Sequence, residues 1–211
     1  MTFDLQKLLR ARDVARDLTY ELSSLIRPGM VEDEAHALYK ELSKKHAVSK
    51  QWHPPKLRFG PNTTRSFKEP SQDYVLKEND IYFIDIGPVI DDHEADYGET
   101  FSLGNDFGNK HLADCAKKVF DETSQYWLQE KCNGPTLYQY AQGRARHYGY
   151  DLNSYSDGHR IGDFPHHVHF KGGLEECAEV VIPNAWILEI HLMNKTTGVG
   201  AFYEDILMEQ N

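Results

Sequence analysis

The sequence has little cysteine, and what it has is scattered. Cys115, Cys132 and Cys177 are the three cysteines among 211 residues, and no two of them form a CxxC pair. An odd number at wide spacing argues against a disulfide framework and against a thiolate zinc site. Because this usage is typical of a reducing compartment, we expect a cytoplasmic protein.

Positive charge is also scarce. The chain has 23 lysines and arginines against 33 aspartates and glutamates, which gives a net charge of −10. Such an acidic chain is a poor candidate for binding nucleic acid or an anionic membrane surface. There is no run of 18 apolar residues and no apolar signal region at the charged N-terminus. We therefore expect no nucleic-acid partner and no membrane association.

The composition predicts one globular domain. Hydrophobic residues make up 40% of the chain and aromatic residues 12%. This is enough for one ordinary core and too little for two, so we expect a single domain over residues 1–211. Apolar spacing and Pro/Gly breaks predict helices over residues 3–26, 31–46, 111–131 and 136–148. Strands are expected at 81–87 and 98–103, joined by a polar loop at 91–94, with short strands and loops over 155–208.

A weak internal repeat relates the two halves of the chain. Each half reads as helix, break, helix and a strand that carries an acid, followed by a second acid. The first half places Asp85 in IYFIDIG and Asp96 in EADYGETF, and the second places Glu189 in AWILEIHL and Glu204 in GAFYEDIL. Two α/β segments can look alike by chance. The alternative is a pseudo-twofold α+β fold in which four strand-borne carboxylates converge.

Four converging carboxylates need positive charge. A carboxylate in an apolar strand is costly without a partner, and four together would otherwise take up protons. Two divalent metal ions would neutralise them, and an imidazole ligand would suit the same site. His159 is the candidate, because Gly158 precedes it and an Ile-Gly turn follows. A lone histidine of this kind is more often structural, but this one accompanies four acids.

These residues resemble the pita-bread metallopeptidases, the family of methionine aminopeptidase, aminopeptidase P, prolidase and creatinase. The first two ligands of that family are aspartates eleven residues apart, as Asp85 and Asp96 are. Its histidine ligand lies in a GHxIG-like motif, matched by His159, and its last two ligands are glutamates on paired strands, matched by Glu189 and Glu204. The resemblance covers nearly the whole chain. It implies two pseudo-twofold α/β halves around a central curved antiparallel sheet, without the extra N-terminal domain of the larger members.

The resemblance also implies a reaction. Two divalent ions, held by the five matched residues, would share a bridging hydroxide that attacks a peptide or amide carbonyl. Glu189 would pass a proton to the leaving nitrogen, and His166, seven residues after His159, would hydrogen-bond the substrate. Oxygen-rich ligands favour Mn, Fe or Co over Zn. We expect a short peptide or an amide-like small molecule as substrate, as for an Xaa-Pro or methionine aminopeptidase, and consider a homodimer.

The chain departs from this family where the peptidases handle substrate. Phe67 stands eighteen residues before the first aspartate, where the peptidases carry a histidine. Glu99 replaces a basic residue and, if near the site, would disfavour an anionic substrate group. His191 shares a strand face with Glu189 and is either a replacement for the missing histidine or a rim residue. His53, beside Pro54-Pro55, either lines the pocket entrance or is a loop histidine, the second being the more common case.

Three classes of function stay open. The first is a two-metal aminopeptidase or dipeptidase. The second is a metal-dependent enzyme on a non-peptide small molecule, which Phe67 favours. The third is a non-catalytic binding protein, which five intact ligands argue against. His167 and His169 alternate on the expected strand HHVHF and are interpreted as peripheral.

Overall fold

A computed structural model of the chain describes residues 3–153 and 155–209. Its main sheet is antiparallel and has the strand order β2-β3-β6-β9-β8-β7. In that order the strands are Lys56–Phe59, Ile81–Ile86, Tyr97–Ser102, Val199–Ile206, Ile187–Asn194 and Asp151–Leu152. A smaller sheet joins β1 (Lys50–Gln51), β4 (Pro88–Ile90) and β5 (His93–Glu94). Strands far apart in the sequence, β6 and β9, therefore meet at the centre.

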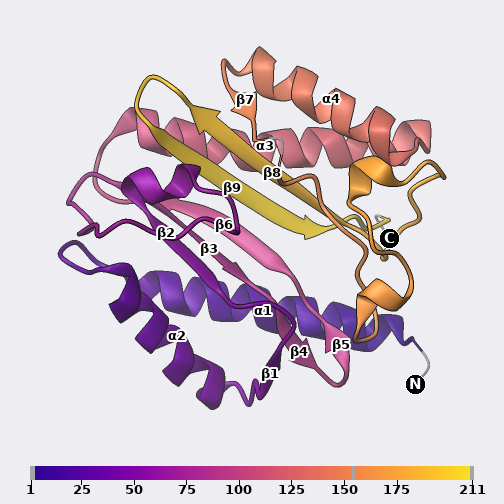
Figure 1. The fold of residues 1–211 in the computed structure, drawn as a ribbon, viewed down its shortest axis with the longest axis horizontal. Coiled ribbons are helices and arrows are strands. Elements are labelled where there is room, and N and C mark those ends of the chain that lie inside the picture. Colours follow the sequence, from indigo (N-terminus) through magenta and orange to yellow (C-terminus); the bar gives the residue numbers. More distant parts are fainter. Residues whose placement is uncertain (1–2, 154, 210–211) are drawn as a thin grey trace.

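Two helix pairs flank this sheet, one from each half of the chain (Figure 1). The first pair is α1 (Leu5–Leu25) and α2 (Glu32–Lys45), and the second is α3 (Phe107–Glu130) and α4 (Gly134–His147). Each pair packs its apolar face into its own core, together with the strands of its half. Within the described ranges, no helix combines the length and the apolarity that crossing a bilayer requires.

Capping residues set the helix ends. The Asp4 carboxylate accepts from the backbone N–H groups of the first turn of α1, and the Asp106 carboxylate accepts from Asn109 N at 2.8 Å at the start of α3. Because of the second cap, α3 begins at Phe107 rather than at the expected residue 111. Asn133 caps α4 in the same way. The four helices otherwise lie where the sequence predicts them.

Three local expectations are wrong. The segment HHVHF is not a strand: His166–Val168 form a short 3₁₀ helix, so its histidines do not alternate between two faces. Residues 91–94 are not a simple loop, because Asp91 and Asp92 turn with positive φ between β4 and β5. The C-terminal region contains long strands rather than short ones, since β8 and β9 are each eight residues long.

Candidate metal centre

One row of the sheet aligns three of the four acids. Asp85 on β3 lies opposite Gly98 on β6, and Gly98 lies opposite Glu204 on β9. Glu189 on β8 completes the row, opposite Glu204. Directly opposed residues of antiparallel strands place their side chains on the same face. The three carboxylates therefore project from one face of the sheet, at its centre.

That face is turned away from the helices. Ile84 and Ile86 flank Asp85 in the strand and pack into the core of α1 and α2. Leu188 and Ile190 flank Glu189 and pack into the core of α3 and α4. Because side chains alternate along a strand, the apolar neighbours anchor the sheet while the acids face the opposite side.

A glycine at the middle of the row lets the acids approach. A Cβ at Gly98 would lie 2.7 Å from Glu204 Oε1 and 2.6 Å from the ring of Phe202, closer than real contacts allow. Glu204 Oε1 is buried and has no hydrogen-bond partner among the described residues. A buried carboxylate oxygen without a donor is unfavourable unless a cation binds it.

The fourth acid, Asp96, lies just before β6 and is 2% exposed. His159 Nε2 is 2.7 Å from Asp96 Oδ2, while His159 Nδ1 donates to the carbonyl of Arg160 at 2.7 Å. Gly158 makes this approach feasible: its φ is +107°, and a Cβ there would lie 2.1 Å from the Ile187 carbonyl oxygen. The loop can therefore run against β8 only with glycine at this position.

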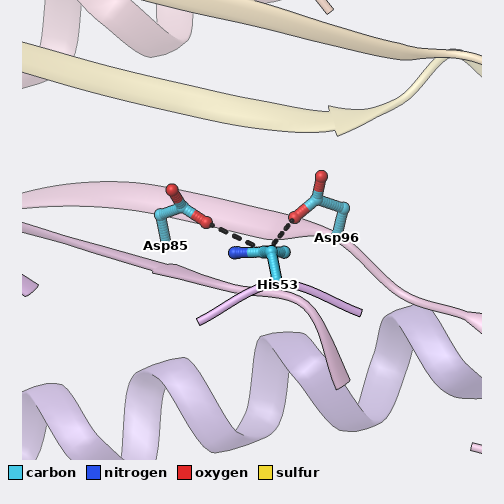
Figure 2. Close-up of side chains that lie close together, drawn as sticks. All are labelled: His53, Asp85 and Asp96. Atoms are coloured by element: carbon cyan, nitrogen blue, oxygen red, sulfur yellow. Dashed lines mark hydrogen bonds and ion pairs between the residues drawn. The ribbon is translucent and has the colours of Figure 1, made fainter. Parts of the chain in front are cut away.

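His53 belongs to the same cluster, as Figure 2 shows. Its Nε2 lies 3.2 Å from Asp96 Oδ1 and 3.5 Å from Asp85 Oδ1, and one ligand atom of each of the three residues lies within 4.8 Å of the others. Its Nδ1 donates to the carbonyl of Pro54 at 2.9 Å. Trp52 packs against the His53 ring, with the ring centroids 4.3 Å apart.

Both rings therefore aim the same nitrogen at carboxylates. In a neutral imidazole only one nitrogen carries a proton, and in His53 and His159 the carbonyl bond assigns it to Nδ1. The lone pair of Nε2 then faces carboxylate oxygens, which are also acceptors. Either a proton or a metal ion must lie between them. A histidine that donates Nδ1–H to a carbonyl and offers Nε2 is the usual arrangement of a metal ligand.

The raised pKa values of three of the acids indicate that the site lacks positive charge. Burial and repulsion from the neighbouring carboxylates raise the pKa of Glu189 to about 8, against the attraction of His159. Burial and the nearby Asp96 and Asp85 carboxylates raise the pKa of Glu204 well above its usual value. Burial also raises the pKa of Asp85 to about 6, although the charge of His53 opposes it. Divalent ions would remove these penalties, so the donor set fits them.

The centre opens into a cavity of about 530 Å³, a volume that includes the open solvent at its mouth. Its lining includes the aromatic side chains of Trp52, Phe67 and Tyr155 together with His159 and the four acids. A second cavity of about 330 Å³ adjoins it and shares Phe67, Asp85 and Glu189.

His166 lies beside the centre. Its ring stacks on that of His159 with centroids 5.1 Å apart, and its Nδ1 and backbone N–H bond to the Glu94 carboxylate at 2.5 and 3.1 Å. Glu94 thereby fixes the ring. His167 is exposed, and His169, also exposed, bonds to Asp163 at 2.9 Å.

His191 and Glu99 both have hydrogen-bond partners within the protein. His191 lines the second cavity, but its Nε2–H donates to the Thr63 carbonyl at 2.7 Å and its Nδ1 lies 3.3 Å from Asn153 Nδ2. Both ring nitrogens are used, so neither is offered to a substrate in place of the histidine absent at Phe67. Glu99 lies on the helix side of β6, where it accepts from the Tyr97 hydroxyl at 2.6 Å. It therefore does not set the charge of the cavity.

Comparisons with known proteins identify the family and the fold. Residues 6–208 match the sequence model of metallopeptidase family M24. The prolidase of Pyrococcus horikoshii OT3 superposes with a TM-score of 0.78 at 18% identity, over 98% of this chain and 59% of that one. The X-Pro aminopeptidase of Thermotoga maritima MSB8 gives 0.73 at 19% identity, over 98% and 61%. This chain thus spans about three fifths of the length of these two proteins.

The methionine aminopeptidase of Thermotoga maritima is similar over almost its whole length. It superposes with a TM-score of 0.75 at 16% identity, over 98% of this chain and 96% of that one. A search of curated protein sequences finds no match. The fold is the pita-bread fold that the sequence predicts.

Proposed function

The chain belongs to metallopeptidase family M24, and on that premise we propose that it is a metal-dependent hydrolase of the C–N bond in a short peptide or amide-like small molecule. One observation carries the proposal: four carboxylates and two imidazole lone pairs face one cavity, and no lysine or arginine of the described ranges forms an ion pair with these carboxylates. Such a donor set, at the surface of an open cavity, is suited to metal-assisted hydrolysis.

Five residues would hold two divalent ions: Asp85, Asp96, His159, Glu189 and Glu204. His53 is a sixth candidate, because its Nε2 faces Asp85 and Asp96. Carboxylate oxygens dominate the set, which favours Mn²⁺, Fe²⁺ or Co²⁺ over a structural zinc. When bound, such ions lower the pKa of water and polarise a carbonyl.

The chain's own residues would supply the proton transfers and the orientation. Glu189 is at the edge of the sheet row and lines both cavities, so it is placed to accept a proton and to deliver it to the leaving nitrogen. His166 would hydrogen-bond the substrate through Nε2, as an acceptor from a substrate N–H, because the Glu94 carboxylate accepts its Nδ1–H. Trp52 packs against the rings of His53, His159 and His166 and limits their rotation.

A non-peptide substrate is the second candidate, and Phe67 favours it. Its ring lines both cavities and packs 5.8 Å from the ring of His53, centroid to centroid. A phenyl ring cannot give the hydrogen bond that a histidine would give there, and the loss of such a contact costs about 1–3 kcal/mol. We infer that N-terminal methionine is a poor substrate.

Metal content and hydrolysis test the proposal together. We expect elemental analysis after mild purification or metal titration to give about two divalent ions per chain. His159→Ala should lose one ion and on the order of 10²-fold in activity on a panel of short peptides and amides with Mn²⁺ or Co²⁺. His169→Ala removes an exposed histidine of the same region and is the matched control. Less than ~0.3 equivalents of any divalent metal, with no uptake on titration, would contradict the proposal.

A further inference from the structure

Three positive side chains line the smaller cavity beside the acids. Lys56, Arg58 and Arg65 share this cavity of about 330 Å³ with Asp85 and Glu189. Positive charge is scarce in a chain of net charge −10, so its concentration in one cavity next to a reactive centre is a notable feature.

The sheet register fixes the position of Lys56. Lys56 on β2 lies opposite Asp85 on β3, so it extends the row of the acids by one strand. Neighbouring strands are about 4.8 Å apart, and opposed side chains share a face. Arg58 lies opposite Phe83 in the next row on that face. The strand pairing therefore places Lys56 and Arg58 on the sheet face that carries the acids, with Lys56 directly beside Asp85.

No carboxylate of the described residues pairs with these cations. Lys56 Nζ lies 4.2 Å above the centroid of the Phe67 ring, and no acid of residues 3–153 or 155–209 is within 4.0 Å of it. Arg65 donates through Nε to the side-chain oxygen of Asn62 at 3.1 Å, which leaves its outer nitrogens available. Arg58 donates to the carbonyls of Glu69 and Ser66 at 2.6 and 3.4 Å and to the Ser71 hydroxyl. Arg58 is therefore a fixed charge, whereas Lys56 and Arg65 have donors to offer.

We propose that this cavity binds a carboxylate of the substrate, with Lys56 and Arg65 as its direct contacts and Arg58 as a fixed positive charge behind them. The inference rests on the proposed hydrolase function and narrows its substrate class to anionic peptides or amides. The phenyl ring of Phe67 positions the Lys56 ammonium by a cation–π contact. Glu99 does not oppose the bound anion, because it lies on the far side of the sheet.

Two kinds of substrate would present this carboxylate near the scissile bond. One is the acidic side chain of a first residue, and the other is the C-terminal carboxylate of a dipeptide. Both offer the same group to the same cations. Matched pairs separate them: Asp-Ala-amide against Asn-Ala-amide tests the side chain, and Ala-Ala against Ala-Ala-amide tests the C-terminus.

The experiment compares kcat/KM within each pair for the metal-loaded wild type and for Lys56→Met. We expect the anionic member of one pair to be preferred by roughly 10- to 100-fold, the effect of one charge-assisted hydrogen bond. Lys56→Met should reduce this preference by at least about threefold while Arg65 keeps the remainder, and Lys56→Arg should keep most of it. Lys40→Met, the same change at an exposed site on α2, is the control and should change neither pair.

The possible outcomes test the carboxylate site and the hydrolase function separately. An equal loss on anionic and neutral members in Lys56→Met would mean that the lysine only offsets the acids of the centre, and it would overturn the inference. Hydrolysis without any preference in the wild type would overturn it too, and leave the hydrolase function standing. If no peptide or amide is hydrolysed, the proposed function fails. Calorimetric binding of the same pairs to the metal-loaded protein then still decides whether the cavity selects a carboxylate.

Discussion

His53 and His191 are both buried on the site face of the molecule, and their surroundings give them opposite properties. His53 donates Nδ1–H to a carbonyl and aims Nε2 at Asp85 and Asp96. His191 donates Nε2–H to the Thr63 carbonyl and turns its other nitrogen to Asn153. The first ring has an unsatisfied lone pair among acids, and the second has neutral partners for both nitrogens.

The pKa values follow from these partners rather than from burial alone. Burial lowers the pKa of His53, but the Asp85 and Asp96 carboxylates outweigh it and raise the pKa to about 9. Burial lowers the pKa of His191 to about 4, because its bond to Thr63 opposes burial only weakly. His53, buried among carboxylates, is placed to bind a cation. His191, buried among neutral groups, instead links β8 to the Gly60–Thr64 turn by a hydrogen bond.

The largest loss of metal binding and activity is expected on substitution of Asp96, the carboxylate that contacts both His53 and His159. Asp96→Asn removes one negative charge at the centre and replaces the acceptor oxygen of one of the two ring contacts with an NH₂ donor. We expect loss of at least one metal ion and a fall in kcat on the order of 10³-fold, more than the 10–100-fold typical of residues that only support a ligand. Elemental analysis and turnover with added Mn²⁺ measure both. Full metal content with normal turnover would remove Asp96 from the centre.

The sequence predicts much of this centre because its ligands occupy regular strands. Asp85 and Glu189 each lie between apolar residues whose alternation reveals the buried strand and its two faces. The strand row that aligns them follows from pairing, and the family resemblance supplies the order of the ligands. The helices were predictable for the same reason: their apolar periodicity is strong, and only a cap such as Asp106 shifts a boundary.

Positions that depend on loops and on tertiary contacts could not be predicted in this way. His53 lies in the loop Trp-His-Pro-Pro, and no periodicity says where such a loop ends in space. Its prolines and the pairing of β1 with β4 bring it to the acids. The strand period placed His191 on the correct face, but it could not show that Thr63 and Asn153 occupy both ring nitrogens. HHVHF looked like a strand because the 3₁₀ turn has no distinct pattern.

Alanine at each of the two histidines sharpens the comparison. His53→Ala should weaken metal binding by roughly 10- to 100-fold, the effect of losing a residue that binds or orients a centre. His191→Ala should leave metal affinity within about threefold and lower the free energy of unfolding by ~1–3 kcal/mol, because Thr63 loses its donor. Calorimetric metal titration and denaturant unfolding measure the two quantities. The same loss of metal affinity in both variants would erase the distinction between the two histidines.

The pH dependence of the stability of the metal-free protein should also distinguish His53 from His191. The folded pKa of His191, about 4, lies below the unfolded value near 6.5, so its stability contribution is lost as pH falls from 6.5 towards 4, by up to about 3 kcal/mol. The folded pKa of His53, about 9, lies above the unfolded value, so its contribution is present below pH 6.5 and lost as pH rises through 9.

Thermal unfolding of metal-free protein across pH 4–9 is the measurement. His191→Gln should flatten the acid side of the profile relative to wild type, and His53→Gln should flatten the alkaline side. Added metal should flatten the alkaline side of the wild type, because ions replace the proton between His53 and the acids. A His191→Gln profile that changes only above pH 6.5 would contradict the assignment.

The smallest change in activity is expected on substitution of Phe67, whose ring packs against His53 and contacts the Lys56 ammonium. Phe67→His would add a hydrogen-bonding group where the peptidases that the sequence resembles carry one. It would also remove the ring that supports the Lys56 ammonium, so it should favour neutral methionyl and X-prolyl peptides over anionic ones. We expect a gain of about 3- to 10-fold on the neutral peptides, since one hydrogen bond contributes about 1 kcal/mol. Relative kcat/KM values on the two peptide classes measure the shift. If the wild type already cleaves methionyl or X-prolyl peptides above roughly 10⁴ M⁻¹s⁻¹, a value ordinary for an enzyme on its own substrate, Phe67 has not altered specificity.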